Sequence, residues 1–407
     1  MSGIVLSASV RQNLLSLQST ADLLSTTQNR LATGNKVNSA LDNPTNYFTA
    51  QSLDNRASDI NNLLDGIGNG VQVLQAANTG ITSLQKLVDT AKSIANQVLQ
   101  TTVGYSTKAN VDVTGTGAGT GTVTAANIDT GKLAGSVITF KTSTGTLAVT
   151  IGATFASTAT TATVSSLDQL NSVLASHNVE VNASVSATAD TLTFTSTNDA
   201  ASQTITKTGT APTGEGVDIG GTTATVGTVN AAVADPASQA IRANLVSQYN
   251  GIISQISTTA QDSSFNGINL LNGDTLKLTF NETGKSSLSI QGVTFSASGL
   301  GLGSLTNGTD FLDSTSANNV IASLGSASSS LRTEASALGS NLSVVQIRQD
   351  FSKSLINVLQ TGSSNLTLAD TNQEAANSQA LSTRQSIAVS ALALANTSQA
   401  SVLQLLR

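Results

Sequence analysis

Cysteine and tryptophan are missing from this sequence of 407 residues, and the only histidine is His177. The lack of cysteine excludes disulfides, thiol nucleophiles and cysteine-ligated metals. A single histidine excludes the H-E-x-x-H zinc motif, and no G-x-S-x-G elbow lies near it to suggest a hydrolase triad. We therefore interpret His177 as a surface or packed side chain, and we expect no enzyme activity, no cofactor and no metal.

Charge is also scarce. Only 10% of the residues are charged and 3% are aromatic, whereas an average soluble domain is about 25% charged. The net charge of -6 at pH 7 comes with no cluster of Lys and Arg. Basic surfaces are what bind the phosphates of nucleic acids and anionic lipids. We therefore expect no nucleic-acid partner and no binding to membrane surfaces.

Long, uniformly apolar runs are missing too. Residues 386–406 carry no charge, but Ser, Asn, Thr and Gln interrupt them every few positions. A lipid-spanning helix is more uniformly apolar, so we expect no membrane insertion and interpret this stretch as a face that contacts other protein. The first residues, MSGIVLSASVRQNLLSLQ, lack a basic segment before an apolar core. We expect no secretory signal peptide there.

The two ends of the chain contain helical heptads instead. Spacings of four and three residues indicate a helix seam that packs on another helix. Near the N-terminus this seam comprises Val10, Leu14, Leu17, Ala21, Leu24 and Leu31. The same phase runs from Leu53 to Val98 and misses one position, at Gly70. Further helices are predicted at about 237–260, 320–360 and 366–405, and the last one carries Ile387, Ala391, Leu394, Val402 and Leu405.

The middle of the chain has a different pattern. Short alternating runs such as SVITFKT and DTLTFTST predict strands, with one helix at 165–179. The glycine-rich GTGAGTGT, residues 115–122, lacks the Lys-Ser/Thr of a phosphate loop, and we interpret it as a flexible domain linker. TLKLTF and SSLSIQ predict a β-hairpin at 275–291.

These patterns predict a mainly α protein with a β-rich insertion. The N- and C-terminal segments would form an antiparallel coiled coil or bundle of long helices, and the central β-rich part would be an outer domain. We expect three domains: terminal helices at 1–43 and 366–407, a helical rod domain with the hairpin at 44–105 and 236–365, and a variable outer domain at 106–235.

The run RLATGNKVNSALDNPTNYFTA, residues 30–50, interrupts the first two heptad stretches. Gly34 provides a helix C-cap, while Asn43-Pro44 bars continuation and starts the next helix. The run therefore connects two helices. Two terminal helices alone make a thin core, so their apolar stripes would be exposed in a monomer, and such surface usually marks an assembly interface.

The same residues carry a family resemblance. The chain resembles bacterial flagellin, since Arg30, Leu31, Gly34, Asn38 and Asp42 match the family's R-L-x-x-G-x-x-I-N-x-A-x-D stretch. SSFNGINLLNG is similar to its T-x-F-N-G-x-x-L-L run, and ALANTSQASVLQLLR to its A-Q-A-N-x-x-x-x-x-V-L-x-L-L ending. The similarity covers about residues 1–105 and 236–407.

The resemblance implies a structural subunit that self-assembles into the extracellular flagellar filament for swimming motility. Implied partners are other copies of the chain, the hook-associated junction and cap proteins, a flagellin export chaperone, and the flagellar type III apparatus that exports the chain unfolded. The polymerisation interface would then consist of the terminal stripes and the connector. Its expected residues are Val10, Leu14, Leu17, Leu24, Leu31, Gly34, Asn38, Asp42, Ile387, Ala391, Leu394, Val402 and Leu405.

One stretch departs from the family pattern. Flagellins sensed by Toll-like receptor 5 carry L-Q-R-V-R-E-L-A-V-Q, whereas this chain reads LQKLVDTAKS. We expect the divergent patch, Lys86, Val88, Asp89 and Lys92, to weaken recognition by that receptor.

An alternative is the hook-filament junction protein of the same superfamily, which shares Thr33, Gly34, Val37, Asp42 and Pro44. SSFNGINLL and the VLQLLR ending favour flagellin. An adhesin or enzyme carried by the central domain is a further alternative, and little in the sequence supports it.

Overall fold

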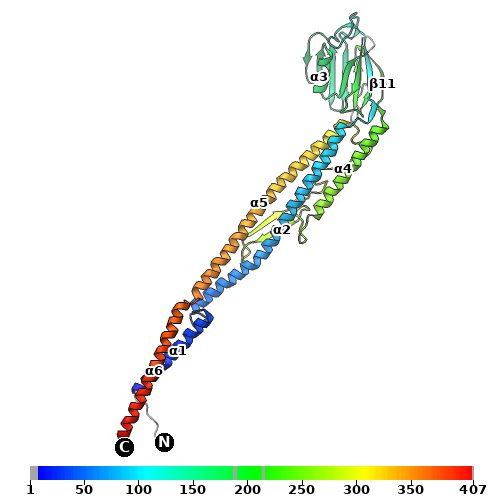
Figure 1. Ribbon diagram of the computed structural model, residues 1–407. Coiled ribbons are helices and arrows are strands. Elements are labelled where there is room, and N and C mark those ends of the chain that lie inside the picture. Colours follow the sequence, from blue (N-terminus) through cyan, green and yellow to red (C-terminus); the bar gives the residue numbers. More distant parts are fainter. Residues whose placement is uncertain (1–7, 187–189, 213–215, 406–407) are drawn as a thin grey trace. The chain divides into compact units, whose positions relative to one another are not determined.

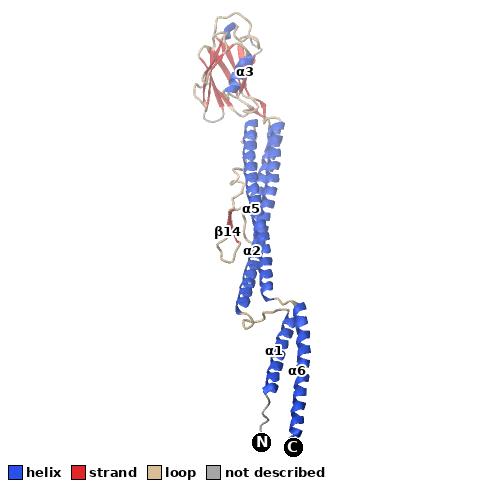
Figure 2. Ribbon diagram, turned by 90° about the vertical axis from the view of Figure 1, so that its left-hand side faces the viewer, coloured by secondary structure: helices blue, strands red, loops and turns tan. Residues whose placement is uncertain are grey.

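The computed structural model describes residues 8–186, 190–212 and 216–405. It is 53% helical, with long helices at both ends of the chain and a β-rich part between them (Figures 1 and 2). The predicted class, a mainly α protein with a β-rich insertion, is confirmed at this level.

The described helices are α1 (Ala8–Thr33), α2 (Pro44–Gln100), α3 (Leu167–Ser176), α4 (Pro236–Asp262), α5 (Ser314–Thr367) and α6 (Thr371–Leu405), with a short 3-10 helix η1 (Gly131–Leu133). The strands of the middle part are β1 (Tyr105–Thr107), β2 (Asn110–Gly115), β3 (Val137–Thr142), β4 (Gly145–Ile151), β5 (Ala156–Ser157), β6 (Thr161–Val164), β7 (Val181–Val185), β8 (Thr191–Ser196), β9 (Thr204–Thr206), β10 (Gly216–Gly221), β11 (Ala224–Asn230) and β12 (Val233–Ala234). The predicted hairpin is β13 (Thr275–Thr279) and β14 (Ser287–Gln291).

The chain forms two compact units. Unit 1 contains Met1–Gln72, Lys277–Ile290 and Asn341–Arg407, and unit 2 contains Val73–Leu276 and Gln291–Ser340. The long helices α2 and α5 contribute to both units. The three-domain division expected from the sequence stays a prediction.

The β-rich part of unit 2 is a sandwich of two sheets. One sheet has the strand order β5-β6-β4-β3-β10-β9, and the other has β11-β2-β8-β7. Phe140 from the first sheet meets Phe194 from the second edge to face, with ring centroids 5.2 Å apart, inside one shared apolar core. Helix α3 adds Leu170 and Leu174 to that core. Strand alternation therefore buries one face of each sheet.

The glycine-rich stretch 115–122 belongs to this sandwich, so its interpretation as a domain linker is wrong. The Gly117 N–H donates to the Lys132 carbonyl at 2.8 Å. A Cβ atom on Gly119 would lie 2.0 Å from the carbonyl oxygen of Gly131. The glycines are needed because two backbone segments approach each other closely here, which leaves no room for side chains.

The helical part of unit 2 has its core where the heptads predict it. The buried positions of α2 within this unit include Leu74, Ala77, Ile81, Leu84, Val88, Ala91, Ala95 and Val98. In α5 they include Leu324, Leu331 and Leu338, at spacings of seven residues. Heptad spacing over such lengths is a strong signal, and the predicted core faces of these two helices are confirmed.

Unit 1 holds two helix pairs. The first part of α2 packs against the last part of α5 through Ala57, Ile60, Ile356 and Leu359. Helix α1 packs along α6, and the two lie side by side and antiparallel in both ribbon views (Figures 1 and 2). The seam between α1 and α6 is thin, since in the part of the chain that the structure describes it is formed by these two helices only.

The missing heptad position of α2 has a physical cause. A Cβ atom on Gly70 would lie 2.4 Å from Cδ2 of Leu278, which comes from the hairpin strand β13. The hairpin side chain therefore occupies the space that a heptad side chain on α2 would fill. Gly66, one turn earlier, has no atom within 4 Å of its Cβ position.

These two glycines allow a matched test of hairpin packing. Gly66→Ala should stabilise the protein by about 0.5–1 kcal/mol, because alanine loses less backbone entropy in a helix. Gly70→Ala should give no such stabilisation, because Leu278 must move to make room for the added methyl group. Gly70→Val should destabilise the protein by about 1–3 kcal/mol for the same reason. Urea unfolding followed by circular dichroism measures both. Equal stabilisation by the two alanine variants would contradict the packing described.

Candidate assembly interface

The connector after α1 begins with a glycine in the left-handed region. Gly34 has φ of 70° and follows Thr33, the last residue of α1, as the predicted C-cap requires. The chain then pairs with the end of α5, since Lys36 N–H donates to the Thr367 carbonyl at 2.7 Å and Ala369 N–H to the Gly34 carbonyl at 2.9 Å. This clasp holds the start of α6 beside the end of α1.

The rest of the connector is a tight turn built around Asp42. Its carboxylate accepts hydrogen bonds from the N–H groups of Asn38 at 3.0 Å and Ser39 at 2.9 Å. These bonds, that of Asn38 first, hold the pKa of Asp42 below its usual range. These hydrogen bonds to the Asp42 carboxylate stabilise the fold at pH values above the ordinary carboxyl pKa. The stabilisation is lost as the pH falls through the lowered pKa of Asp42. The turn leaves Leu41 96% exposed.

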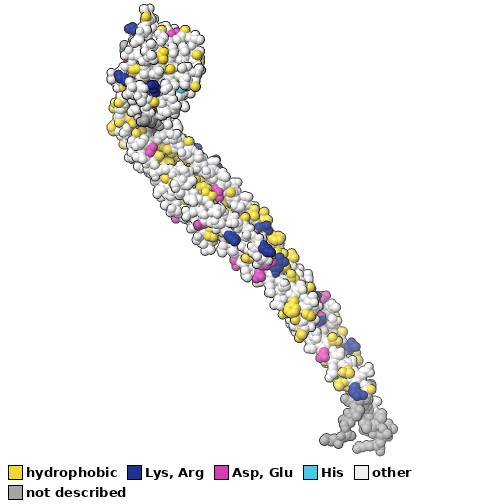
Figure 3. Space-filling model, turned by 180° about the vertical axis from the view of Figure 1, so that it is seen from behind, with side chains coloured by type: hydrophobic (Ala, Val, Ile, Leu, Met, Phe, Trp, Pro, Cys, Tyr) yellow, Lys and Arg dark blue, Asp and Glu magenta, His cyan; other side chains and the backbone are white. Residues whose placement is uncertain are grey.

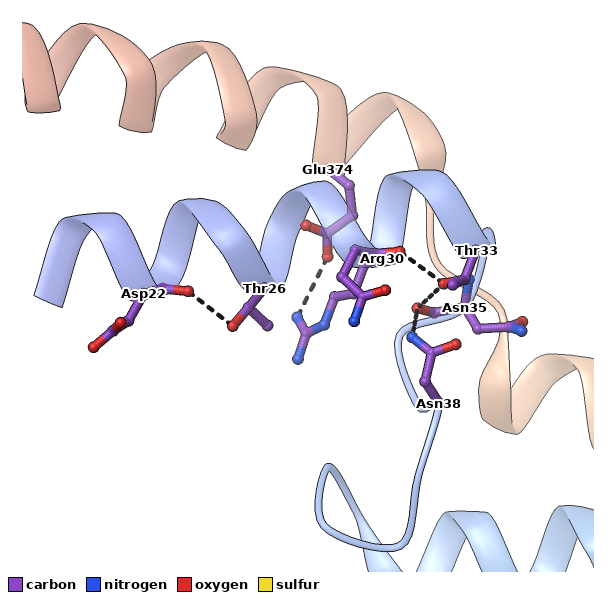
Figure 4. Close-up of polar contacts among 8 residues, drawn as sticks. Asp22, Thr26, Arg30, Thr33, Asn35, Asn38 and Glu374 are labelled. Carbon is purple, nitrogen blue, oxygen red and sulfur yellow. Dashed lines mark hydrogen bonds and ion pairs between the residues drawn. The ribbon is translucent and has the colours of Figure 1, made fainter.

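An ion pair joins α1 to the first turn of α6 (Figure 4). Arg30 Nη1 lies 3.4 Å from Glu374 Oε1, and Glu374 is buried. Among the described residues, Arg30 Nε and Glu374 Oε2 have no hydrogen-bond partner although both atoms are buried. The pair is therefore incompletely satisfied, and its geometry is weaker than that of a bidentate Arg–carboxylate contact.

The covered seam of α1 differs from the predicted stripe. Val10, Leu17 and Leu24 lie on the covered side, as predicted, but the alternate seam positions are polar: Asn13, Thr20 and Thr27. Leu14 and Leu31 are exposed. The Thr20 hydroxyl can be buried because it donates to the Ser16 carbonyl at 2.8 Å. The sequence pattern assigned Leu14 to this seam because it counted apolar residues only.

The apolar stripe of α6 is turned away from its seam. The partly covered positions follow a heptad through Glu374, Ser378, Leu381, Gln385, Ala388, Leu392 and Ala395. Ile387 and Leu394, one residue before the seam positions, are 64% and 72% exposed, and Ala391 is exposed as well. Val402 and Leu405 lie in α6, but their side chains are outside what the structure describes.

Helix α5 carries a second stripe that the sequence interpretation missed. Val344, Ile347, Phe351 and Val358 are exposed, with Ile347 at 66%. Their spacings of three, four and seven residues form a stripe one residue before the buried positions Val345, Ser352 and Leu359, which is about 100° around the helix. These exposed residues could have been predicted from the sequence, because they form a second heptad one position before the core heptad. Figure 3 shows apolar side chains scattered over the helical surface, with few charges.

The receptor patch expected from the sequence is not all on the surface. Lys86, Asp89 and Lys92 are exposed, whereas Val88 is buried in the α2 core. Val88 falls on the helix seam because it shares the heptad phase of Leu84 and Ala91. Of the four divergent positions, only Lys86, Asp89 and Lys92 are therefore on the surface, and the effect on receptor recognition stays a prediction.

Other candidate chemistry is limited. His177 caps the end of α3, and its ring nitrogens lie 2.8 Å from the carbonyl oxygens of Val173 and Thr158, so it is packed into the sandwich. Within the described ranges, no group of three or more His, Asp or Glu residues could hold a metal ion. No described helix combines the length and apolarity needed to span a bilayer.

The helices α5 and α6 thus carry apolar faces that no other part of the described chain covers. Comparison with known proteins names the family it resembles: residues 5–113 match the bacterial flagellin N-terminal helical region, and the predicted resemblance to flagellin is confirmed. The flagellin family is structural rather than enzymatic, and its members form the extracellular flagellar filament, which confirms the predicted location at the level of the family.

Several flagellins of Caulobacter vibrioides are similar to this chain. Flagellin FljK and flagellin FljM are each 32% identical over 165 residues, and flagellin FljO is 30% identical over the same length. Each alignment covers 40% of this chain and 59% of the relative. The similarity thus spans somewhat more than half the length of these curated relatives.

Proposed function

We propose that the chain is a structural subunit that self-assembles into the helical flagellar filament. The observation that carries the proposal is the exposure of Ile387 and Leu394 on α6, in a stretch with no charged residue. Fully burying a side chain of this size stabilises an assembly by about 1.5–3 kcal/mol. Apolar stripes of this kind in a monomer indicate contacts with other molecules.

The partner that fits best is another copy of the same chain. Helices α5 and α6 each have one covered seam and one uncovered apolar stripe, so each can contact a neighbour without releasing its intramolecular partner. We propose that α1 and α6 pair as an antiparallel coiled coil, and that their outer faces, with Leu14 and Leu31, pack on neighbouring subunits. Contacts between different faces of identical subunits generate rings when the rotation closes and open helical arrays when it does not, and we propose the open array here.

The connector belongs to the same interface in this proposal. Gly34, Asn38 and Asp42 shape a turn that holds Leu41 outward, and a side chain so exposed gains by contact with a neighbour. We assign residues 1–43 and 366–407 to the filament core, 44–105 and 236–365 to the rod domain, and 106–235 to the outer domain. Swimming motility is the biological role that follows.

Export and further partners complete the proposal. A chain without cysteine and with mostly small side chains suits passage in an unfolded state through the flagellar type III apparatus. An export chaperone, the hook-associated junction proteins and the filament cap are the partners that such a subunit requires. Lys86, Asp89 and Lys92 remain a divergent surface, with weak recognition by Toll-like receptor 5 expected.

Precipitant-induced assembly of the purified chain tests the proposed function. We expect negative-stain microscopy to show long filaments of uniform width. Rings or short oligomers would favour the junction protein, which is needed in far fewer copies than a filament subunit. A chain that stays monomeric under all precipitant conditions, while remaining folded by circular dichroism, would refute self-assembly.

The outer domain should be dispensable for assembly. The ends of the sandwich are held together, since β1 pairs with β12 and Tyr105 lies opposite Ala234, and a deletion there closes with a short Gly/Ser linker. We expect the variant lacking residues 106–235 to keep its helical circular dichroism and to form thinner filaments. Collapse of the helical signal would show that the sandwich supports the helices.

A further inference from the structure

Arg242 of α4 is the largest fully buried side chain described, with 1% of its surface exposed. Its guanidinium donates only to backbone carbonyls: Nε to Thr102 at 2.8 Å, Nη1 to Phe311 at 2.5 Å, and Nη2 to Val98 at 3.2 Å and Thr101 at 3.1 Å. No salt bridge to Arg242 occurs among the residues that the structure describes. Burying a charge without a direct counter-ion costs folding free energy. The burial of Arg242 therefore does not by itself indicate that the residue stabilises the protein.

The nearest compensation is the carboxylate of Asp313. Desolvation lowers the pKa of Arg242, and the charge of Asp313 opposes that effect. Asp313 is itself buried and accepts hydrogen bonds from Ser202 Oγ at 2.5 Å and from Ser316 N–H at 3.0 Å. It therefore caps the start of α5 and also binds a loop of the sandwich.

The four acceptors lie where unit 2 changes from helices to strands. Val98 is in the last turn of α2, while Thr101 and Thr102 lead toward β1. Phe311 precedes α5, has φ of 61° and is fully buried. Arg242 itself follows the point at which the chain returns from β12 into α4. One side chain of α4 therefore binds the end of α2, the segment that follows α2 and the segment that precedes α5.

Backbone hydrogen bonds run beside this cluster. Gly104 N–H donates to the Leu312 carbonyl at 3.3 Å, and Asp235 N–H donates to Gly104 at 2.9 Å. From the sandwich, the Asp199 carbonyl accepts from Thr315 N–H at 3.1 Å. These segments are connecting loops, which have little apolar burial of their own and move easily when not tied down.

We propose that Arg242 locks the β-sandwich in one orientation on α2, α4 and α5. The planar guanidinium presents several donors in a fixed fork, so it can hold carbonyls from two different connecting segments at once. Its positive charge also suits the carbonyl end of α2. Lysine offers a single compact ammonium group and cannot reproduce this geometry. The inference does not depend on the proposed function, because it concerns unit 2 alone.

The lack of cysteine makes a direct test possible, because introduced cysteines are the only labelling sites. Ser143 in the sandwich and Ser329 on α5 are both exposed. We would replace both by cysteine in the full chain, attach spin labels, and measure the distance distribution by pulsed electron paramagnetic resonance. Wild type should give one narrow distance. Arg242→Met and Arg242→Lys should each broaden the distribution at least twofold.

A destabilising variant elsewhere separates orientation from stability. Leu331→Ala removes a buried side chain from the α5 core of unit 2 and should lower the melting temperature without broadening the distribution. A narrow distribution in Arg242→Lys would overturn the proposal, and so would equal broadening by Leu331→Ala. If Arg242→Met fails to fold, the distance distribution of Arg242→Lys tests the proposal alone. Lysine keeps the positive charge and most of the side-chain volume.

Discussion

Leu394→Asp should abolish filament formation while leaving the isolated chain folded. Leu394 is 72% exposed on α6, so replacing it costs the monomer little, as surface substitutions are usually within about 0.5 kcal/mol. In the proposed filament the same position is buried, and no charged residue between Ser386 and Leu406 can pair with the new carboxylate. The effect is therefore expected in the polymer alone.

The size of the effect follows from burial. The variant loses about 1.5–3 kcal/mol of apolar burial and adds the cost of burying an unpaired charge, which is larger than that of a neutral polar group. A loss of about 3 kcal/mol already raises a dissociation constant by more than about 100-fold. We expect no filaments at protein concentrations where wild type assembles completely.

Phe155→Asp is the matched control. Phe155 is a large exposed side chain in the sandwich, so this variant also replaces an exposed apolar side chain with aspartate, but outside the proposed interface. Sedimentation after seeding should show filaments for Phe155→Asp and none for Leu394→Asp, with unchanged melting temperatures for both monomers. Filaments of normal yield from Leu394→Asp would remove α6 from the assembly role.

The second large effect is expected from Leu24→Pro. Leu24 lies in the interior of α1, on the side covered by α6. Proline there removes a helix hydrogen bond and clashes with the preceding turn, at a cost of about 3 kcal/mol or more. Because α1 pairs with α6 through a thin seam, losing half of α1 should release both helices. Assembly should then fail completely.

Unit 2 should be unaffected by that change, since distant sites are roughly additive. Leu24→Ala is the control, because it removes the same side chain while alanine favours the helix. We expect Leu24→Ala to assemble, and Leu24→Pro to keep the thermal transition of unit 2 while losing helical signal. A loss of the whole cooperative transition in Leu24→Pro would show that α1 supports the fold itself.

Local signals account for what the sequence predicts well. Gly34 and Pro44 set the ends of α1 and α2 because a left-handed glycine stops a helix and proline suits its first position. The core faces of α2 and α5 follow from heptads such as Leu324, Leu331 and Leu338. A heptad that continues for many turns leaves little choice of buried face.

The interface is harder to read because its seams mix polar and apolar residues. Thr20 and Thr27 are buried in α1 while Leu14 is exposed, so counting apolar positions selects a face that is rotated from the true seam. The stripe containing Ile347 on α5 went unnoticed because the stronger core heptad lies one residue away. In α5 and α6 the exposed and covered stripes are offset by one residue, about 100° around the helix, and which of them is covered depends on the packing of the helices.

The sequence predicts that the middle of the chain forms strands, but it does not predict how those strands are ordered in the two sheets. Strands β3 and β10 pair across almost eighty residues of intervening chain, with Ile219 opposite Phe140, and such pairing leaves no local signal. The glycines of 115–122 were misread for the same reason, since the segment they pack against, around Gly131 and Lys132, is set by tertiary structure.

Helical reconstruction of assembled filaments by electron cryo-microscopy tests the central claim most directly. The account predicts that Ile387 and Leu394, both more than half exposed in the single chain, are buried against side chains of a neighbouring subunit. Leu14 and Leu31 should become covered in the same way. Filaments in which Ile387 and Leu394 still face solvent, with the subunits joined through other surfaces, would contradict it.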